Sequence, residues 1–320
     1  MILRSNLVRA VGLVALALLL AYAMPAPAQT QPAVLRAAVV APGVWALVGP
    51  LGGPSLDNQA LNASYGVVAT PAGTILIDSG ASAQGAQLLA GMARQLTGLP
   101  VRWVINTGSQ RHRWLGNDHL RVAGAQVIAH TRTVQTQRAM APDQTTELQA
   151  LLGERFAGTR PGHADRVVEG ARTELSLGGV RVELLYLGDA HLPGDTVVWL
   201  PAGKIAFSGD LVYVERLLSL AAQSNGPSWL AAFERLAALA PAQVVPGHGG
   251  PTDMASAQAQ TGAYLRFVVD GVKRHAKEMT GVEAAVAELG MAPPFAQLAN
   301  FVPLHRANIN RAYLRAEVGD

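Results

Sequence analysis

The sequence predicts an α/β fold of the α+β kind, built as four layers in the order helix, sheet, sheet, helix (αββα), with extra helices at the C-terminal end. Short apolar segments bounded by Gly, Pro, Asn or Ser are typical of strands, and they occur in two groups, one before residue 130 and one between residues 173 and 245. Each group is followed by segments in which apolar residues recur with helical spacing. Because each sheet must bury an apolar face, we expect two sheets packed face to face with helices outside them.

The composition agrees with a globular protein that has a large core. Of the 320 residues, 50% are hydrophobic and 15% are charged, which is not the composition of a disordered chain. The net charge of +3 comes without any run of Lys or Arg, so we expect no nucleic-acid partner. There is no cysteine, which excludes disulfides, thiolate ligands and cysteine nucleophiles.

Turn residues separate the strands predicted in the first half. Pro42-Gly43 and Pro71-Ala72-Gly73 are each typical of a hairpin turn, and residues 51–61 form a loop rich in Gly, Pro, Asn and Ser. Helical segments are predicted at residues 81–96 and 131–156. The predicted strands lie within residues 34–48 and at residues 65–69, 74–77, 101–105 and 125–129.

The second half repeats this alternation and ends in helices. An amphipathic helix is predicted at residues 229–239, followed by a short strand at residues 244–245. The tail, about residues 254–320, is mainly helical and is interrupted at Met291-Ala292-Pro293-Pro294. Glycine turns separate the preceding strands, which are predicted at residues 173–177, 180–187, 196–200 and 204–207.

The N-terminus has the features of a secretory leader. Arg4 and Arg9 precede an apolar stretch at residues 10–23, which is short for a membrane span. Ala26-Pro27-Ala28 then places small residues where a signal peptidase cleaves. We predict a signal peptide at residues 1–28 and a mature domain of residues 29–320 that is periplasmic or secreted, with no membrane attachment after cleavage. The alternative is an uncleaved membrane anchor.

Export of this kind makes a prediction about mass. The mature N-terminus should lie near Gln29, because Ala28 ends the best cleavage site after the apolar stretch. Intact-mass measurement on protein recovered from the periplasm checks this. A mass that still contains residues 1–28 would reject the leader.

Three segments that follow predicted strands carry side chains able to bind a metal. LGDAHLPGD contains His191, FSGDLV contains Asp210, and VVPGHGGP contains His248. Imidazole and carboxylate are the usual zinc ligands when cysteine is absent, and neighbouring glycines let the backbone approach an ion. Each segment alone is also an ordinary turn, but their order and spacing together favour a metal site.

This combination resembles the metallo-β-lactamase superfamily of hydrolases, across residues 34–251. In that family a strand leads into a box of the form THxHxDHxxGN, and later segments GxxHxPGD, SGD and PGHG add a histidine, a bridging carboxylate and a last histidine. The resemblance implies the αββα sandwich of that family, with His191, Asp210 and His248 as metal ligands. It also implies that Asp78, in the turn IDSG, supports the site. The tail, which contains LHRANINRAYLR, is similar to that of exported quinoprotein-relay zinc metallohydrolases.

The segment NTGSQRHRWLGND stands where the family has its box, and the two align without a gap on the initial NT and on GN. Gly108 and Gln110 then take the positions of the first two histidines. His112 replaces the aspartate, and Arg113 replaces the final histidine. The frame of the loop is therefore present, but its usual ligands are changed.

These changes limit what the box can bind. Arg113 keeps its proton and has no acceptor, so it cannot be a ligand, and it either points away from an ion or binds a substrate carboxylate. Gln110 offers only an amide oxygen. His119, just past the box, either lies on a helix surface or lines the site. The family site holds two metal ions, but here we expect one zinc ion or none. The remaining candidate ligands are His112, His191, Asp210 and His248.

Two classes of function remain open, and both require a small-molecule substrate or ligand. The first is a hydrolase of an ester, lactone, thioester or amide, in which at most one metal activates water and Asp210 orients or deprotonates it. The second is a non-catalytic binding protein that keeps the fold and the cleft. The three intact segments favour the hydrolase, and the altered box favours the binding protein. Metal analysis separates them; if one zinc binds, His191→Ala and His248→Ala should each remove it.

Overall fold

The computed structural model describes residues 34–318. These residues form one compact unit, and the predicted signal peptide lies outside them. Within residues 34–318, no helix is long and apolar enough to cross a membrane.

The first sheet has seven strands that are hydrogen-bonded in chain order. The first four are antiparallel hairpin neighbours, and the last three continue the sheet in parallel through helical crossovers. The strands are β1 (Arg36–Ala41), β2 (Val44–Val48), β3 (Ser64–Thr70), β4 (Gly73–Ile77), β5 (Val101–Ile105), β6 (Gln126–His130) and β7 (Arg166–Val168).

The second sheet has five strands in the order β12-β11-β10-β9-β8. Its neighbours are antiparallel except for β11 and β12, which run parallel and are connected through a helix. Its strands are β8 (Arg172–Leu177), β9 (Val180–Leu185), β10 (Val197–Leu200), β11 (Ile205–Tyr213) and β12 (Gln243–His248).

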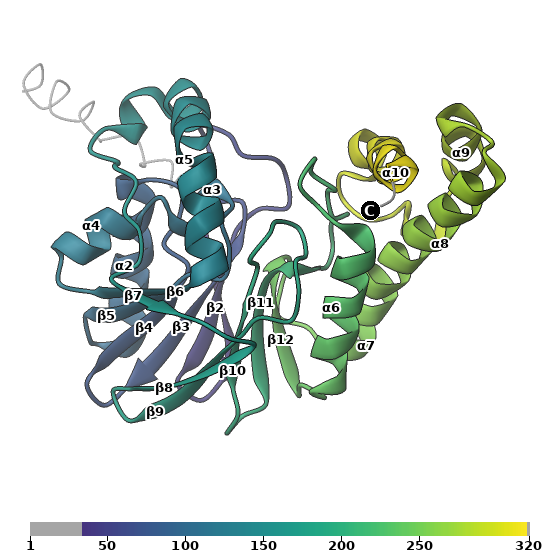
Figure 1. The fold of residues 1–320 in the computed structure, drawn as a ribbon. Coiled ribbons are helices and arrows are strands. Elements are labelled where there is room, and N and C mark those ends of the chain that lie inside the picture. Colours follow the sequence, from purple (N-terminus) through teal and green to yellow (C-terminus); the bar gives the residue numbers. More distant parts are fainter. Residues whose placement is uncertain (1–33, 319–320) are drawn as a thin grey trace, which may run out of the picture. The chain divides into compact units, whose positions relative to one another are not determined.

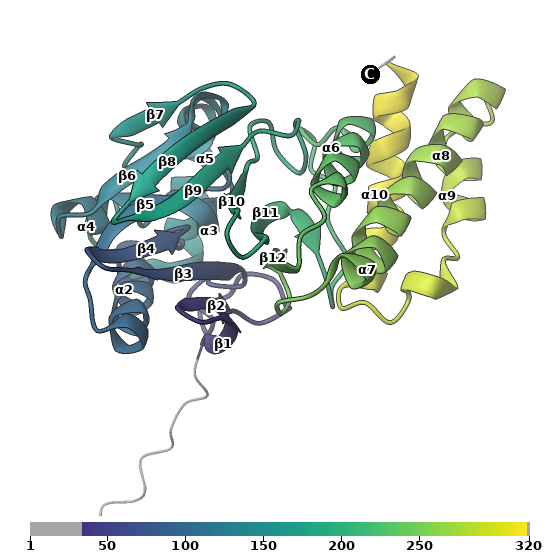
Figure 2. The same cartoon turned by 90° about the horizontal axis from the view of Figure 1, so that it is seen from below.

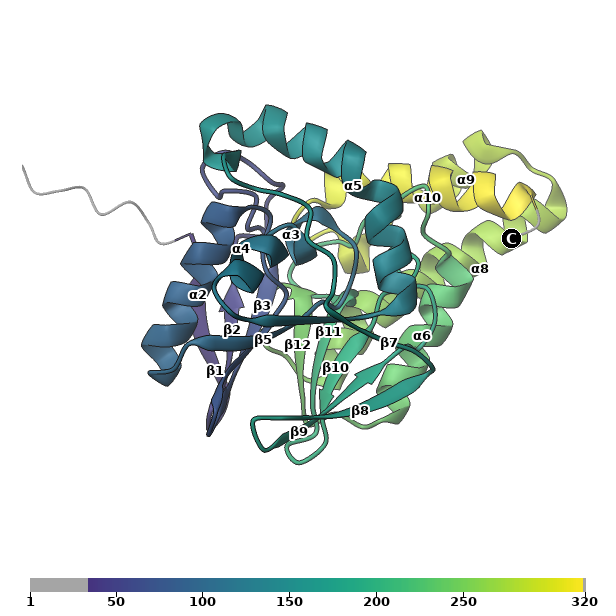
Figure 3. The same cartoon turned by 60° about the vertical axis from the view of Figure 1, so that its left-hand side comes forward.

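Helices cover the outer face of each sheet (Figure 1). Figure 3 shows α2, α4 and α5 along the same side of the first sheet. Figure 2 shows α8, α9 and α10 side by side beyond the second sheet, in agreement with their mutual contacts. The α-helices are α2 (Ala83–Thr97), α3 (Arg111–Trp114), α4 (Asn117–Val122), α5 (Thr131–Leu152), α6 (Gly226–Ala238), α7 (Met254–Ala257), α8 (Ala263–Glu278), α9 (Val282–Leu289) and α10 (Phe301–Glu317), with the short 3₁₀-helices η1 (Gly153–Phe156) and η3 (Pro293–Phe295) and the π-helix η2 (Gln258–Gly262).

The strands consist largely of apolar residues because they bury side chains in the core between the two sheets. Ile75, Ile105, Phe207 and Val245 come from both sheets and belong to one buried cluster. Gly66 in β3 makes this packing possible, because a Cβ atom there would lie 2.4 Å from the ring of Phe207. The predicted αββα sandwich with extra C-terminal helices is confirmed.

Several element boundaries differ from the sequence prediction. The predicted loop after β5 contains the short helices α3 and α4, and β7 had not been predicted. The segments that hold Asp210 and His248 belong to β11 and β12 and are not loops. The sequence prediction missed these parts of the strands because a glycine there is typical of a turn. Gly209 has φ 49°, and the pairing of β11 with β12 shifts register on both sides of it. The strand thus continues through a turn-like sequence as a bulge.

Candidate metal and substrate site

Three candidate ligands meet at one edge of the two sheets. His112 comes from α3, directly after β5, Asp210 from β11, and His248 from the end of β12. Parallel β11 and β12 bring the last two side by side, because their register places Gly209 opposite Pro246 and Tyr213 opposite His248. All three residues are buried.

These three side chains point their ligand atoms toward one another. His248 Nε2 lies 3.3 Å from Asp210 Oδ1, and His112 Nε2 lies 3.6 Å from Asp210 Oδ2. One ligand atom from each residue falls within 4.8 Å of the others. His112 Nε2 is buried and has no hydrogen-bond partner. The cluster can therefore hold a metal ion.

The protonation of the two histidines is set by burial and by one carbonyl. His248 Nδ1 lies 2.7 Å from the carbonyl oxygen of Asn62, so that nitrogen must carry the proton and donate it. Burial lowers the pKa of His248 to about 4 and that of His112 to about 3. Both rings are therefore neutral at pH 7, and His248 Nε2 presents a lone pair to Asp210.

Arg113 lies behind this cluster and does not reach the surface. Its side chain is fully buried, and all five N–H donors find acceptors. Nη2 donates to Asp210 Oδ1 at 2.6 Å and to the Gly247 carbonyl at 2.8 Å, while Nε donates to Asp210 Oδ2 at 3.4 Å. Nη1 donates to Asp78 Oδ2 at 3.0 Å and to the Ser64 carbonyl at 2.9 Å. A guanidinium held in this way has no donor left for a substrate carboxylate.

The guanidinium also controls the charge of Asp210. Burial by itself would raise the pKa of this carboxyl, but the neighbouring Arg113 guanidinium is the main opposing influence, and the pKa lies well below its usual range. Asp210 is therefore an ionised carboxylate throughout the neutral range. A group with so low a pKa is a weak proton acceptor.

Asp78 is hydrogen-bonded to two residues of the box, Thr107 and Arg113. It follows β4 with φ 65°, and its Oδ1 accepts the backbone N–H of Thr107 at 2.8 Å. Its Oδ2 accepts the Thr107 hydroxyl at 2.7 Å and also Arg113. Burial raises the pKa of Asp78 to about 6 against the opposing effect of Arg113. These bonds fix the first residues of the box to the turn after β4.

His191 lies next to the three-residue cluster but outside it. Its Nδ1 lies 2.8 Å from the carbonyl oxygen of Ser219, which leaves Nε2 as the acceptor, and that atom contacts the Gln110 side-chain amide. The role of His191 as a fourth ligand stays a prediction. His119, half-buried on α4, does not line the adjacent cavity.

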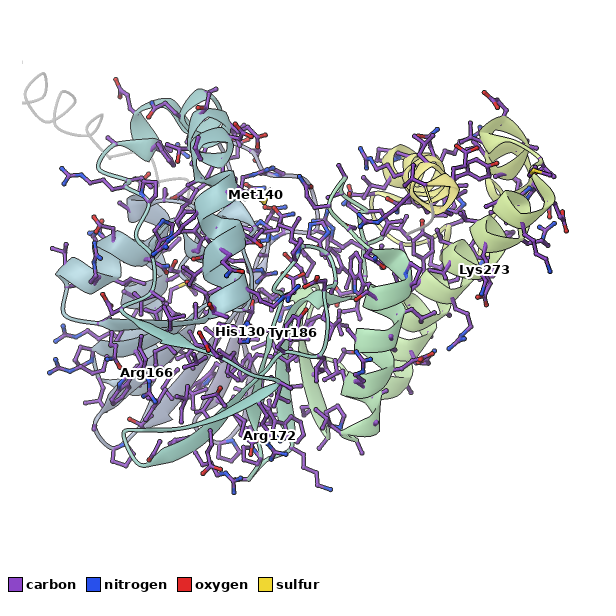
Figure 4. All side chains as sticks on the ribbon, in the orientation of Figure 1. His130, Met140, Arg166, Arg172, Tyr186 and Lys273 are labelled. Atoms are coloured by element: carbon purple, nitrogen blue, oxygen red, sulfur yellow. The ribbon has the colours of Figure 1, made fainter. Side chains whose placement is uncertain are left out.

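Two histidines elsewhere have structural partners. His130 stacks on Tyr186 with ring centroids 5.1 Å apart, and the two side chains lie together near the end of β6 (Figure 4). His163 stacks on Trp114 with centroids 5.3 Å apart.

A cavity of about 650 Å³ opens onto the metal-capable cluster. Gly53 and Pro54, from the loop after β2, are among the residues that line it. This loop is fastened from the far side, because Asn300 donates to the Leu51 carbonyl at 2.8 Å. Sequence reasoning had missed the following lining residues: Asn62, Tyr213, Arg216 and Arg311. Arg216 lay only six residues past Asp210, and its position next to a candidate ligand was the one signal available.

The profile described as "Metallo-beta-lactamase superfamily" matches residues 59–248, more than half of the chain and all of the candidate ligands. The chain belongs to the metallo-β-lactamase superfamily. A metallo-β-lactamase from Pontibacter korlensis has a similar structure, with a TM-score of 0.56 and 22% identity over 72% of this chain and 99% of that one. The DIM-1 metallo-β-lactamase is similar at a TM-score of 0.55 and 20% identity, over 71% and 94% of the two chains.

Another solved structure and a curated relative are also similar to parts of this chain. A metallo-β-lactamase from Erythrobacter litoralis has a TM-score of 0.54 and 20% identity over 70% of this chain and 96% of that one. At these identities the similarity shows the fold. The 2,4-dinitroanisole O-demethylase subunit alpha of Nocardioides sp. (strain JS1661) is 31% identical over 85 residues, which is 27% of this chain. The matched part is about a quarter (26%) of that relative.

Proposed function

We propose that this superfamily member is a hydrolase that uses one zinc ion, held by His112, Asp210 and His248, to cleave an ester, lactone, thioester or amide. The observation that carries the proposal is the convergence of three buried ligand atoms within 4.8 Å, one of them without any hydrogen-bond partner. A bound zinc ion would supply Lewis-acid activation of the reacting carbonyl and of the attacking water.

The charges of the cluster fit a cation. His248 donates from Nδ1 to Asn62, so its Nε2 lone pair faces the ionised carboxylate of Asp210 at 3.3 Å. Two acceptors at that distance repel each other unless a cation lies between them. The carbonyl that fixes His248 also resembles the outer partners that orient metal-ligating histidines in general.

The same geometry disfavours a second ion. Gly108 has no side chain, and a Cβ atom there would lie 2.7 Å from Asp195 Oδ1. Gln110 is engaged with His191, and Arg113 holds both oxygens of Asp210. A guanidinium already supplies positive charge where a second ion would need the carboxylate. We therefore propose one zinc ion, with the family's box changed in its ligands.

Asp210, His112 and the overhanging loop would each have a distinct role in hydrolysis. Asp210, whose pKa is low, would orient the attacking water and stabilise the positive charge of the ion, and it does not take up a proton. His112, neutral and without a hydrogen-bond partner on Nε2, is available to bind the ion through that nitrogen. The overhanging loop at Gly53 and Pro54 shields the reacting atoms from bulk water, which strengthens electrostatic interactions in the site.

Zinc content tests the ligand set. His112→Ala and His248→Ala should each reduce bound zinc to a trace, because each leaves at most two protein ligands of the proposed three. His163→Ala should keep it, since that ring stacks on Trp114 outside the cluster. His191→Ala tests the fourth ligand separately, because zinc falls in this variant only if His191 exchanges Gln110 for the ion. Elemental analysis of protein purified without chelator gives the result, and zinc that is unchanged in both of the first two variants would show that the site is wrong.

A non-catalytic binding protein is the second candidate function. The pairing of Arg113 with Asp210 and of Gln110 with His191 favours it, because each pair engages a candidate metal ligand with another side chain. Hydrolysis assays on zinc-loaded protein distinguish the two functions. Turnover of 4-nitrophenyl acetate that is lost in His248→Ala supports the hydrolase. Tight zinc binding without turnover of any ester, lactone, thioester or amide supports the binding protein.

A further inference from the structure

A second cavity lies among the C-terminal helices, between α8, α10 and residues 218–227 at the start of α6. Its volume is about 950 Å³, more than that of the cavity at the metal-capable cluster. α8 contacts both α6 and α10, as can be followed in Figure 2. Aliphatic side chains form most of the lining, and those on α8 include Leu265, Val268, Val269 and Val272. The proposed hydrolase leaves this cavity without a role.

The buried polar residues of this lining, Tyr264 and Ser224, already have hydrogen-bond partners. Tyr264 Oη lies 3.0 Å from His305 Nδ1 and accepts a hydrogen bond from Asn308 Nδ2 at 3.0 Å. Ser224 Oγ donates to the His191 carbonyl at 2.6 Å. A polar group that entered the floor of the cavity would lose its bonds to water without replacing them. The part of a ligand that lies on the floor must therefore be apolar.

The exposed edge of this cavity is positively charged. The chain has only three lysines, and two of them line the cavity. Lys273 and Lys277 lie one turn apart on α8 and are both exposed, and Figure 4 labels the first of them. Neither forms an ion pair with another residue in the described part of the chain. Arg311 and Arg315 line the cavity from α10, and Asp270 is the only acidic residue in its described lining. The edge therefore attracts an anionic group.

Part of the apolar lining remains open to solvent. Leu314 is 50% exposed, and Val318, just after α10, is 78% exposed. Apolar side chains that stay exposed beside a concave apolar floor are typical of a surface that a ligand covers. A hydrocarbon chain bound there would remove these side chains from water, which is favourable in proportion to the apolar area buried. An apolar floor with a cationic edge fits a ligand that has an apolar chain and an anionic head.

We propose that this cavity binds one long-chain fatty-acid anion, with its hydrocarbon chain on the apolar floor and its carboxylate at Lys273 and Lys277. A volume of about 950 Å³ suits a single small molecule, and a concave wall encloses one chain and not the flat surface of a bilayer. Lysine suits the edge, because its aliphatic stem packs on apolar surface while its ammonium stays in water. The site goes beyond the proposed function and requires neither zinc nor hydrolysis.

A wall separates the fatty-acid site from the cavity at the metal-capable cluster. Ala221, Ala222 and Arg311 line both cavities, so the segment before α6 lies between them. Helix α10 holds this segment in place. Asn308 Oδ1 accepts the Leu220 backbone N–H at 2.9 Å, and Arg311 Nη1 donates to the Leu220 carbonyl at 2.8 Å. The two sites can therefore be tested independently of each other.

Calorimetric titration of chelator-treated protein tests the site without any catalysis. The probes are hexanoate, octanoate, decanoate and the neutral 1-decanol, at matched ionic strength and below the concentrations at which they aggregate. One molecule should bind per chain, and affinity should rise about fourfold for each added methylene group, as expected when each is removed from water. Affinity that does not increase from hexanoate to decanoate would overturn the inference.

Two sets of variants locate the head and the chain of the ligand. Lys273→Gln with Lys277→Gln should weaken decanoate about fivefold, the usual size of an exposed ion-pair effect, and leave 1-decanol little changed. Lys204→Gln, at the remaining lysine, is the matched control, because that side chain is exposed and lines neither cavity. Val269→Asp puts a carboxylate on the half-buried wall and should weaken both probes at least about tenfold, since a charge there opposes burial of the chain.

Val302→Asp is the control for that change. Val302 is 86% exposed on α10 and lines neither cavity, so this variant should bind decanoate like wild type. Melting temperatures show which variants are folded. If Val269→Asp does not fold, the lysine variant and the series of chain lengths still decide, because exposed lysines can be replaced without disturbing the core. Decanoate affinity that is the same in wild type and in the folded variants would place the ligand elsewhere and overturn the inference.

Two further measurements examine the other possible occupants, a second copy of the chain and a membrane surface. Sedimentation velocity without ligand should show the same oligomeric state for wild type and Val269→Asp. A wild-type dimer that Val269→Asp converts to a monomer, without decanoate binding, would assign the cavity to a second copy and overturn the inference. Pelleting of the protein with phosphatidylglycerol vesicles, again without decanoate binding, would overturn it in favour of a lipid surface.

Discussion

Replacement of Arg113 by methionine is expected to destabilise the fold by roughly 3–5 kcal/mol, the usual effect of breaking a buried ion pair. The guanidinium bonds Asp78 and Asp210, both of which are almost fully buried. Without it, two carboxylates remain in the interior with no cation, and the carbonyls of Ser64 and Gly247 lose a donor. The melting temperature of metal-free protein should fall on the order of 10 °C, because 1 kcal/mol corresponds to about 2–4 °C in a protein of 150–250 residues.

Two further variants decide how that loss arises. Arg113→Lys keeps the charge but cannot make five directed bonds, so its melting temperature should lie between those of wild type and Arg113→Met. Arg274→Met removes an arginine from an exposed pair with Glu288 and should change the melting temperature little. If metal-free Arg113→Met and metal-free wild type have the same melting temperature, the guanidinium does not neutralise the buried carboxylates.

Rebuilding the box is the second large effect. The change Gly108→His, Gln110→His, His112→Asp and Arg113→His is expected to raise bound zinc from at most one ion per chain to about two, the number held in two-metal hydrolase sites. Two ions would then supply the positive charge that Arg113 supplies now. Stability of this variant should accordingly depend on zinc, and chelator should lower its melting temperature more than that of wild type.

The frame for those four side chains is present. Thr107 is fixed to Asp78, and Asn106 is bonded to Asn117 at the far end of the loop. Gly108 does not have a positive φ, so a side chain there is not strained by the backbone. The obstacle is Asp195, whose Oδ1 would lie 2.7 Å from the new Cβ atom and must move. Because that atom has no hydrogen-bond partner, little is lost when it shifts.

The matched control keeps the arginine. Gly108→His, Gln110→His and His112→Asp together, with Arg113 unchanged, should bind at most one zinc, because the guanidinium still engages Asp210 through both oxygens. Elemental analysis and melting with and without chelator give both readouts. A folded four-residue variant that binds no more zinc than wild type would mean that the loop does not present these positions to the ions.

Much of the fold followed from local chemistry. Apolar runs with glycine turns located most of the strands, because a buried strand needs apolar side chains and a turn needs residues that tolerate its backbone. The strand β7 escaped prediction because it has three residues, with Arg166 and Val167 exposed. The full lengths of β11 and β12 escaped because Gly209 and Gly247 look like turn residues, although the sheet pairs across them through shifted register.

The sequence by itself determined which side chains are able to bind a metal and at which positions along the chain they occur. His112 follows β5, Asp210 lies in β11 and His248 ends β12, and the structure brings all three together. Only the tertiary structure decided where the long side chains point. Arg113 donates hydrogen bonds to Asp78, Asp210 and Gly247, which lie 35, 97 and 134 positions away in the chain. Arg216 donates to the Gly52 carbonyl, 164 positions away. The direction and partners of a flexible arginine depend on charges that only folding brings near it, and no local pattern records them.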